Sequence, residues 1–415
     1  MSESVSAVTP HAGALDVALG PGGLRPAFQP IVDLGTGRLV GYEALARGAP
    51  GAALVRPDQL FAVARAAGRL VELDWACRLA ALECSRGLEA TLFVNVEPEA
   101  LGSVAPAGMR ERVGAALRGR DIVVELTERE LAARPAELLG TVEGLRAHGL
   151  GIAVDDVGAQ TSSLALLPLL APDVVKLDLR LVQQHPSREL AAIVNAVRAH
   201  RERTGAQVIA EGIETEEHRE IARAVGATLG QGWLFGRPGP LPAQPVAGRV
   251  PRVCAARPVA GTTPFEVVRR LRPVERSTKP LLLAMTEQLE EAAKGLDRDV
   301  VVISAFQTAE RFTAGTARRY AELAARAAFV GALGLDLPAE PVPGVRGGRL
   351  SPSDCLADEW SVVVIGHHFA GALVAQDLGD EGSEAQRRFD FAVTYDRDLV
   401  VAAAATLLRR IAPLG

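Results

Sequence analysis

The feature that most constrains the fold is a regular alternation of short apolar runs and longer amphipathic segments between residues 24 and 240. Strands that alternate with helical patterns are typical of βα units and a parallel sheet. Eight such runs in about 215 residues fit a (β/α)₈ barrel. The predicted strands cover residues 27–32, 39–46, 91–96, 122–126, 152–155, 174–177, 208–211 and 227–231.

The connection between the first two runs sets them apart from the others. Residues 33–38 contain Gly-Thr-Gly and are too few for a helical crossover. We therefore predict an antiparallel hairpin here. The expected fold class is α/β: a TIM-like barrel with an antiparallel first strand.

The length of 415 residues exceeds the usual ceiling of about 300 for one core, so a second domain is expected. We predict a mobile N-terminal segment (1–23), the barrel (24–240), a linker rich in Pro, Ala, Val and Gly (241–264), and a smaller α/β (α+β) domain (265–415). In the last of these, strands are expected at 300–305, 360–366 and 389–394, and helices at 265–271, 280–294 and 399–411.

Charge and hydropathy exclude several classes of protein. The formal net charge is −5 with scattered basic residues, which argues against binding of duplex nucleic acid. Residues 1–20 have no Lys or Arg and do not form a signal peptide, and His367 and His368 interrupt the longest apolar stretch. The four cysteines are far apart. We expect a cytoplasmic protein with reduced thiols and no membrane insertion.

Nearly every apolar run of the barrel ends in a polar residue. Because the carboxyl ends of all strands of such a barrel meet at one mouth, these side chains should converge there. A single one of them fits a helix cap or a turn equally well, but a whole set is a candidate active site. The set comprises Glu43, Asn95, Glu125, Asp155, Asp156, Lys176, Glu211 and Gln231.

Five carboxylates in one cavity repel each other unless cations bind between them. Carboxylate and amide oxygens without His or Cys suit Mg²⁺ or Mn²⁺ rather than zinc. The adjacent Asp155 and Asp156 can bridge two ions, an arrangement that activates water against a phosphodiester. Lys176 can orient that water or neutralise developing charge. We therefore predict two ions per site.

Residues 42–47 read YEALAR. This stretch resembles the motif that names the EAL family of cyclic di-GMP phosphodiesterases. The similarity continues in order through FQPI (28–31), VNV (94–96), ELTE (125–128), DD (155–156), KLD (176–178), AEGIE (210–214) and QGWLF (231–235).

The resemblance implies a role for each matching residue. Glu43, Asn95, Glu125 and Asp155 would hold one metal ion, with Asp155 shared and Asp156 on the second. Glu211 and Lys176 would handle the catalytic water, supported by Gln231. Substrate contacts would come from Gln29 and from Arg47, whose forked donors suit a phosphate, while Phe235 and Pro238 would meet a guanine. For Arg47 a structural salt bridge, and for Phe235 ordinary packing, remain alternatives.

One loop departs from the family pattern. The family reads FGTGYSSL after its paired aspartates, whereas residues 157–164 read VGAQTSSL. In the family this loop holds the metal ligands and helps to form a dimer, steadied by a glutamate that matches Glu128. The resemblance thus implies hydrolysis of cyclic di-GMP to pGpG and a homodimer through the barrel. Alternatives are a catalytically weak or inactive cyclic di-GMP receptor and a metal-dependent barrel acting on another substrate.

Residues 300–306 and 389–396 of the second domain resemble, more loosely, the DICT sensory domain that accompanies cyclic di-GMP signalling proteins. No catalytic pattern occurs in this region. We therefore assign regulation to it, with a signalling partner as a further expectation.

Overall fold

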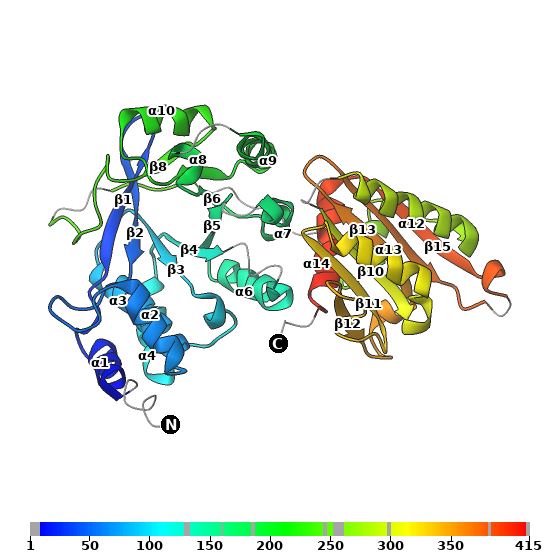
Figure 1. Ribbon diagram of the computed structural model, residues 1–415, viewed down its shortest axis with the longest axis horizontal. Helices are drawn as coiled ribbons and strands as arrows, with labels where there is room; N and C mark the ends of the chain where they lie inside the picture. Colours follow the sequence, from blue (N-terminus) through cyan, green and yellow to red (C-terminus); the bar gives the residue numbers. More distant parts are fainter. Residues whose placement is uncertain are drawn as a thin grey trace, which may run out of the picture.

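The structure is a computed structural model, and it describes residues 9–127, 133–158, 161–183, 187–243, 247–251, 261–296, 300–380 and 383–411. Two sheets organise these residues: a closed eight-stranded barrel and a separate seven-stranded sheet. Figure 1 shows the barrel and the sheet side by side, with helices around both.

The barrel confirms the predicted fold class. Its strands follow each other around the barrel in chain order. β1 is antiparallel to both β2 and β8, and all other neighbours are parallel, as the short first connection predicted. The strands are β1 (Ala27–Asp33), β2 (Leu39–Leu45), β3 (Thr91–Asn95), β4 (Ile122–Thr127), β5 (Gly151–Val157), β6 (Val174–Leu177), β7 (Gln207–Ala210) and β8 (Leu229–Gln231).

Side chains fill the inside of the barrel below its mouth. Phe93, Val123 and Ala153, from three successive strands, belong to one fully buried cluster. Val250, from the predicted linker, joins this cluster, and its N–H donates to Thr91 Oγ1 at 2.9 Å. The chain leaving the barrel therefore seals the end opposite to the mouth, so the mouth is the open end for chemistry.

Helices cover the outside of the barrel. They are α2 (Pro57–Ala66), α3 (Leu70–Cys84), α4 (Ala107–Leu117), α6 (Pro135–Ala147), α7 (Leu167–Leu170), α8 (Arg180–Gln183), α9 (Arg188–Thr204) and α10 (Glu216–Ala224), with the 3₁₀ turns η1 (Pro98–Ala100) and η2 (Thr161–Leu166). Among the described residues, no helix has both the length and the hydropathy needed to cross a membrane.

Part of the segment predicted to be mobile is helical. Thr9–Leu19 form α1, and its Leu15 and Ala18 are buried in a cluster with Leu60 and Ala64 of α2. The apolar side chains of α1 thus find partners 45 residues further along the chain, which local composition does not reveal.

The second sheet has the strand order β12-β11-β10-β13-β14-β15-β9. Along β13, Val362 and Val364 join one apolar cluster, and Val363 and Ile365 join another, so the two faces are both covered. The elements are α11 (Pro264–Arg269), β9 (Glu275–Thr278), α12 (Lys279–Lys294), β10 (Val301–Thr308), α13 (Ala314–Ala324), β11 (Phe329–Leu335), β12 (Arg346–Leu350), β13 (Glu359–Ile365), β14 (Ala370–Asp377), β15 (Arg388–Thr394) and α14 (Arg397–Leu408), with η5 (Glu384–Gln386).

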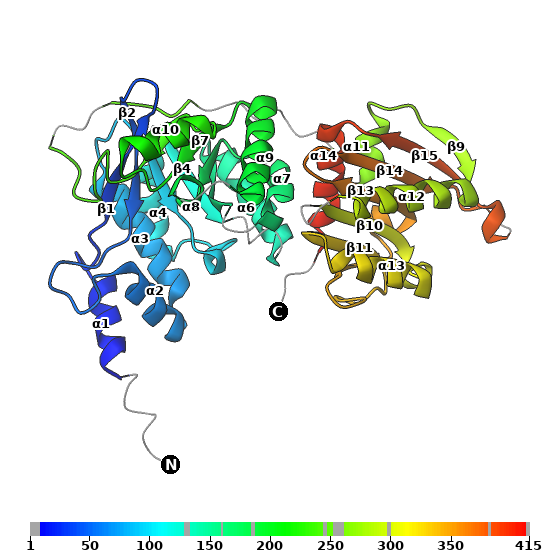
Figure 2. The same cartoon turned by 45° about the horizontal axis from the view of Figure 1, so that its top comes forward.

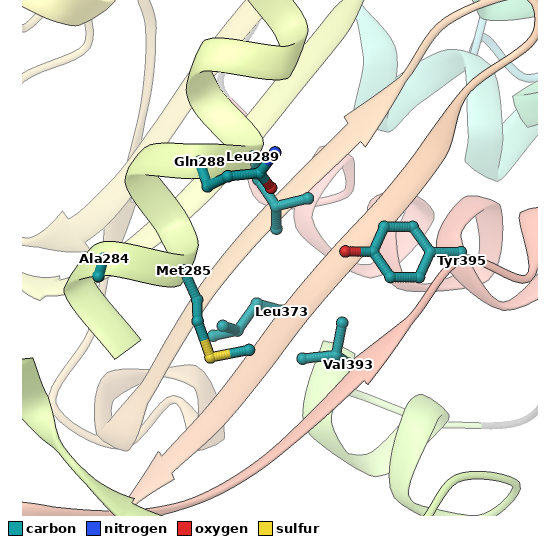
Figure 3. A pocket seen from close by; sticks show the side chains of 7 residues that line it. All are labelled: Ala284, Met285, Gln288, Leu289, Leu373, Val393 and Tyr395. Carbon is teal, nitrogen blue, oxygen red and sulfur yellow. The ribbon is translucent and has the colours of Figure 1, made fainter. Parts of the chain in front are cut away.

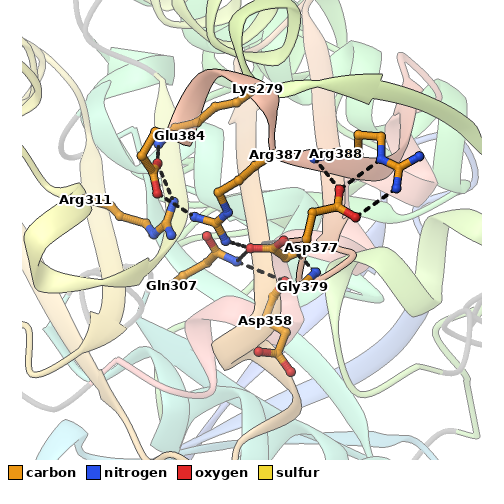
Figure 4. A network of polar contacts seen from close by, with 10 residues as sticks. Lys279, Gln307, Arg311, Asp358, Asp377, Gly379, Glu384, Arg387 and Arg388 are labelled. Carbon is orange, nitrogen blue, oxygen red and sulfur yellow. Dashed lines mark hydrogen bonds and ion pairs between the residues drawn. The ribbon is translucent and has the colours of Figure 1, made fainter. Parts of the chain in front are cut away.

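A polar cluster joins the β14–β15 connection to β10 and α12 (Figure 4). Gln307, in the left-handed region with φ 64°, donates through Nε2 to Asp377 Oδ2 at 3.1 Å. Asp377 also pairs with Arg387, which reaches Glu384 at 3.1 Å. Lys279 pairs with the same Glu384. Since each of these carboxylates already has a cationic partner, we interpret the cluster as a structural lock and not as a second acidic site.

A buried carboxyl of β13 gives the second domain a predictable response to pH. Glu359 is 3% exposed, and its Oε2 accepts a hydrogen bond from the N–H of Phe265 at 3.1 Å. Burial raises its pKa from 4.5 to about 7. Because the folded-state pKa is the higher one, ionisation costs stability as the pH rises from about 4.5 to about 7.

We therefore expect Glu359→Gln to stabilise the protein at alkaline pH. The amide keeps the acceptor for Phe265 but removes the buried charge, so the free energy of unfolding should exceed that of the wild type by roughly 2–3 kcal/mol at pH 8 and by little at pH 5. Denaturant titrations at both pH values measure this, with the exposed Glu275→Gln as control. Equal stability at pH 8 would show that Glu359 ionises without penalty.

Candidate active site

The carboxylates at the barrel mouth surround Lys176. This residue stands in β6, and its side chain is 1% exposed. Its Nζ lies 2.8 Å from Glu211 Oε1, 2.9 Å from Glu125 Oε1, 3.1 Å from Asp155 Oδ1 and 3.5 Å from Glu43 Oε2. Closure of the barrel thus brings together the acidic side chains that the strand ends predicted.

Two amide side chains hold the carboxylate of Glu43. Asn95 Nδ2 donates to Oε1 at 2.9 Å, and Gln231 Nε2 donates to Oε2 at 2.6 Å. Gln231 Nε2 also lies 3.1 Å from Gln29 Oε1, and Gln29 donates in turn to the Gly236 carbonyl. This chain of amides runs from β8 to β3 and fixes the orientation of Glu43.

An irregularity at the end of β5 positions the paired aspartates. The register of β5 against β6 shifts between Val154 and Val157. Asp156 has φ 58°, a left-handed conformation that residues other than glycine rarely adopt, and its N–H donates to Asp155 Oδ1 at 2.9 Å. Carboxylate oxygens of Asp155, Asp156 and Glu211 consequently lie within 4.8 Å of one another.

Burial dominates the protonation of the cluster. It raises the pKa of Glu125 well above its usual range, with help from the nearby charge of Glu43. It also raises the pKa of Glu211, to about 8, although Lys176 acts in the opposite direction. Burial would raise the pKa of Glu43 too, but Lys176 and the two amides outweigh it and lower this pKa. For Lys176 burial favours the neutral amine, but the carboxylates outweigh it and hold its pKa well above the ordinary value.

These protonation states imply that one lysine does not balance the negative charge of the cluster. Both oxygens of Glu125 are buried and accept no hydrogen bond from the described residues, although Oε1 lies within ion-pair distance of Lys176. Buried carboxylate oxygens without such partners are costly. The available ligand atoms are carboxylate and amide oxygens, which hard divalent cations prefer. The residues present therefore fit Mg²⁺ or Mn²⁺.

The predicted substrate contacts come from β1, from the end of β2 and from the chain after β8. Phe235 packs over Gly230 of β8, and Pro238 precedes Gly239, which pairs with Phe28 of β1. Arg47 follows β2, and its guanidinium donates to the carbonyl of Ala46 at 2.7 Å. Arg47 forms no salt bridge with any described residue, so the alternative of a structural salt bridge has no support in these contacts.

The structure describes only part of the two loop features that were predicted, Glu128 and the loop after Asp156. Glu128 lies outside the described residues, as do residues 159 and 160 of the loop that departs from the family pattern. Gly158 of the same loop has φ 96°, and a Cβ atom there would come within 2.9 Å of Leu181. The start of this loop is thus packed tightly against the barrel.

Asp74 is a buried residue near the site that was not predicted from the sequence. This residue of α3 is 2% exposed and pairs with Arg78, and its Oδ1 accepts a hydrogen bond from the N–H of Glu97 at 3.0 Å. It therefore fixes the backbone two residues after Asn95. A carboxylate on the apolar side of a helix was the signal in the sequence.

The second domain has a cavity of about 290 Å³ between α12 and the sheet (Figure 3). Met285 and Leu289 of α12 face Leu373 and Val393 across it, with Tyr395 at one side. Among the described residues that line it, Tyr395 alone is titratable. These residues do not form a set for acid–base or metal chemistry, so the barrel mouth is the candidate active site.

Fold and site together define a (β/α)₈-type barrel with an antiparallel first strand and a carboxylate cluster around a buried lysine, followed by an α/β domain. Comparison of the chain with models of known protein families identifies the family to which it belongs. The EAL domain model matches residues 12–238, and the chain belongs to this family. The DICT model, described as a sensory domain in diguanylate cyclases and two-component systems, matches residues 266–378. Both resemblances noted in the sequence are confirmed.

Curated relatives are similar over the barrel. The cyclic di-GMP phosphodiesterase RocR of Pseudomonas aeruginosa is 32% identical over 225 residues, which are 51% of this chain and 57% of RocR. The bifunctional diguanylate cyclase/cyclic di-GMP phosphodiesterase MucR of the same species is 35% identical over 51% of this chain and 33% of MucR. The oxygen sensor protein DosP of Escherichia coli is 30% identical over 60% of this chain and 32% of DosP. The chain thus spans between about a third and three fifths of these relatives.

A solved structure shows the same fold over the barrel, and a second one is similar in sequence. The EAL enzyme Bd1971 in its cAMP- and cyclic-di-GMP-bound form has a TM-score of 0.50 at 22% identity, covering 57% of this chain and 68% of that one. The MucR phosphodiesterase in complex with cyclic di-GMP has a TM-score of 0.48 at 29% identity, covering 56% of this chain and 98% of that one.

Proposed function

We propose that the chain is a metal-dependent phosphodiesterase that hydrolyses cyclic di-GMP to pGpG. The observation that carries the proposal is the buried Lys176 with four carboxylates around it, in a chain of the EAL family. One of the four belongs to Asp155, the neighbour of Asp156. The names of RocR and MucR support this substrate.

Two divalent cations, Mg²⁺ or Mn²⁺, fit the acidic cluster. Glu43, Asn95, Glu125 and Asp155 would hold one, and Asp155 and Asp156 the other. Bound there, the cations would supply Lewis acidity to a water molecule and to the phosphodiester. The amide chain from Gln231 through Gln29 keeps Glu43 in one orientation for this purpose.

The remaining residues have roles that follow from their positions. Glu211 is the candidate to accept the proton of the attacking water, because its carboxylate lies beside Asp155 and Asp156, where bound cations would favour its ionised form. Lys176, whose Nζ contacts Glu211, would balance the charge that develops during attack. Arg47 would bind a phosphate, and Phe235 and Pro238 would contact a guanine at the side of the barrel formed by β1 and β8.

The second candidate function is a cyclic di-GMP receptor with negligible turnover. The loop after Asp156, whose residues depart from the family pattern, favours it. We further propose that the DICT-like domain regulates the barrel. A homodimer through the barrel and a signalling partner of the second domain stay predictions.

An activity assay tests the proposal. The 415-residue protein is incubated with cyclic di-GMP and Mg²⁺ or Mn²⁺, and the nucleotides are then separated by chromatography. We expect pGpG from the wild type and from Glu89→Ala, which alters an exposed carboxylate before β3, and none from Glu43→Ala. Intact nucleotide that binds to the protein would favour the receptor. Absence of both binding and turnover would overturn both functions.

A further inference from the structure

The last helix of the chain, α14, is apolar on all sides. No residue from Leu399 to Leu408 is exposed. Val400, Ala403 and Leu407, spaced three and four residues apart, are completely buried, and α14 contacts β10, β13 and β14 of the sheet. A helix that is apolar all round requires a second partner on its other side.

Besides the sheet, both α11 and the barrel pack against α14. Arg409 of α14 pairs with Glu143 of α6, and α14 also contacts α7. Ala405 and Val401 lie one and two turns before Arg409, so they share its side of the helix, and both are partly buried against the same core cluster. Figures 1 and 2 both show α14 between the second sheet and α7.

The core is continuous across this contact. One apolar cluster includes Leu164 and Leu167 of the barrel together with Val400 and Leu408 of α14. A cavity of only about 20 Å³, room for about one water molecule, remains between η2, α7 and α9 on one side and Gly366, His367 and Arg397 on the other. The two domains therefore pack as closely here as elements within one core.

The segment that α14 covers follows directly after the paired aspartates. Val157, the next residue after Asp156, is completely buried, and the chain then passes Gly158 into η2 and α7. Arg146 of α6 fixes the end of α7 by donating to the Leu170 carbonyl at 2.9 Å. α6 thus holds α7 through Arg146 and contacts α14 through Glu143, which places η2 and α7 between the barrel and α14.

We propose that Ala405 and Val401 of α14 are positioning residues, which hold η2–α7 in place and thereby fix the bulge that presents Asp155 and Asp156. This inference rests on the proposed function only for the identity of the reaction. The support that α14 gives to the backbone of residues 161–170, which we call the bracing, does not depend on that reaction. The second domain would set the divalent-cation affinity of the barrel through this contact.

The substitution Ala405→Glu in the 415-residue protein tests the proposal. Glutamate favours helices, but a charge at the docked side of α14, near Glu143, should loosen the contact. We expect amide hydrogen exchange of residues 161–170 to accelerate by about tenfold or more. Mn²⁺ affinity, measured by calorimetry, should fall by about threefold or more. Ala284→Glu, on the exposed side of α12, is the matched control and should change neither.

A charge exchange gives a second test that leaves buried residues intact. Arg409→Glu should accelerate the same exchange by roughly two- to fivefold, and adding Glu143→Arg should restore the wild-type rate. Unchanged exchange at 161–170 in both Ala405→Glu and Arg409→Glu would overturn the bracing, whatever the activity. Absence of cyclic di-GMP turnover in the wild type would instead contradict the proposed function. The hydrogen-exchange measurement would still decide whether α14 braces residues 161–170.

Discussion

Replacing Glu211 by glutamine is expected to lower kcat for cyclic di-GMP by about a hundredfold to ten-thousandfold. The amide keeps the size of the side chain and can still contact Lys176, whose Nζ lies 2.8 Å from Glu211 Oε1, but it accepts no proton from water. General base catalysis contributes about this factor to hydrolytic reactions. Because Glu211 makes no contact that binding of the nucleotide requires in our proposal, Kd for cyclic di-GMP should stay within about threefold of the wild type.

The control for this substitution is Glu214→Gln. Glu214 is exposed and lies three residues further along the chain, before α10. It has no described contact with the acidic cluster, so kcat should be unchanged. Equal kcat values for Glu211→Gln and the wild type would remove Glu211 from the reaction. Loss of binding together with turnover would make it a ligand of substrate or metal instead.

The barrel and its acidic mouth could be predicted because both follow from local patterns. Each strand is a short apolar run, and the polar residue at its end, such as Glu43 or Glu125, marks the mouth whatever the order of the strands. The antiparallel first strand followed from the length of residues 33–38 alone, because six residues cannot form a crossover helix.

Features that depend on distant parts of the chain could not be predicted in the same way. The φ of 58° at Asp156 results from the register shift between β5 and β6, and no local signal distinguishes this aspartate from its neighbour. The packing of α14 on α7 joins segments more than 200 residues apart. Its sequence, LVVAAAATLL at residues 399–408, is apolar all round, but it does not identify the partners that bury it.

Replacing Lys176 by methionine should destabilise the cation-free protein by roughly 3–5 kcal/mol. The lysine is 1% exposed, and four carboxylates lie within 3.5 Å of its Nζ. Methionine fills a similar volume without charge, so the buried carboxylates lose their cation, and the loss of one partner from a buried ionic cluster is costly. Denaturant titration in EDTA measures the difference. Saturating Mn²⁺ should recover most of it, because bound cations would replace the missing charge.

The matched control is Lys294→Met, which removes a lysine that is 28% exposed and pairs with Glu291 at 3.3 Å and Glu322 at 3.4 Å. A pair of this kind contributes about 1 kcal/mol or less, so this variant should stay close to the wild type with and without Mn²⁺. Similar losses in the two variants would mean that burial of Lys176 does not matter. A large loss at Lys176 that Mn²⁺ leaves unchanged would separate the lysine from the metal site, and the acidic cluster would then owe its stability to the lysine alone.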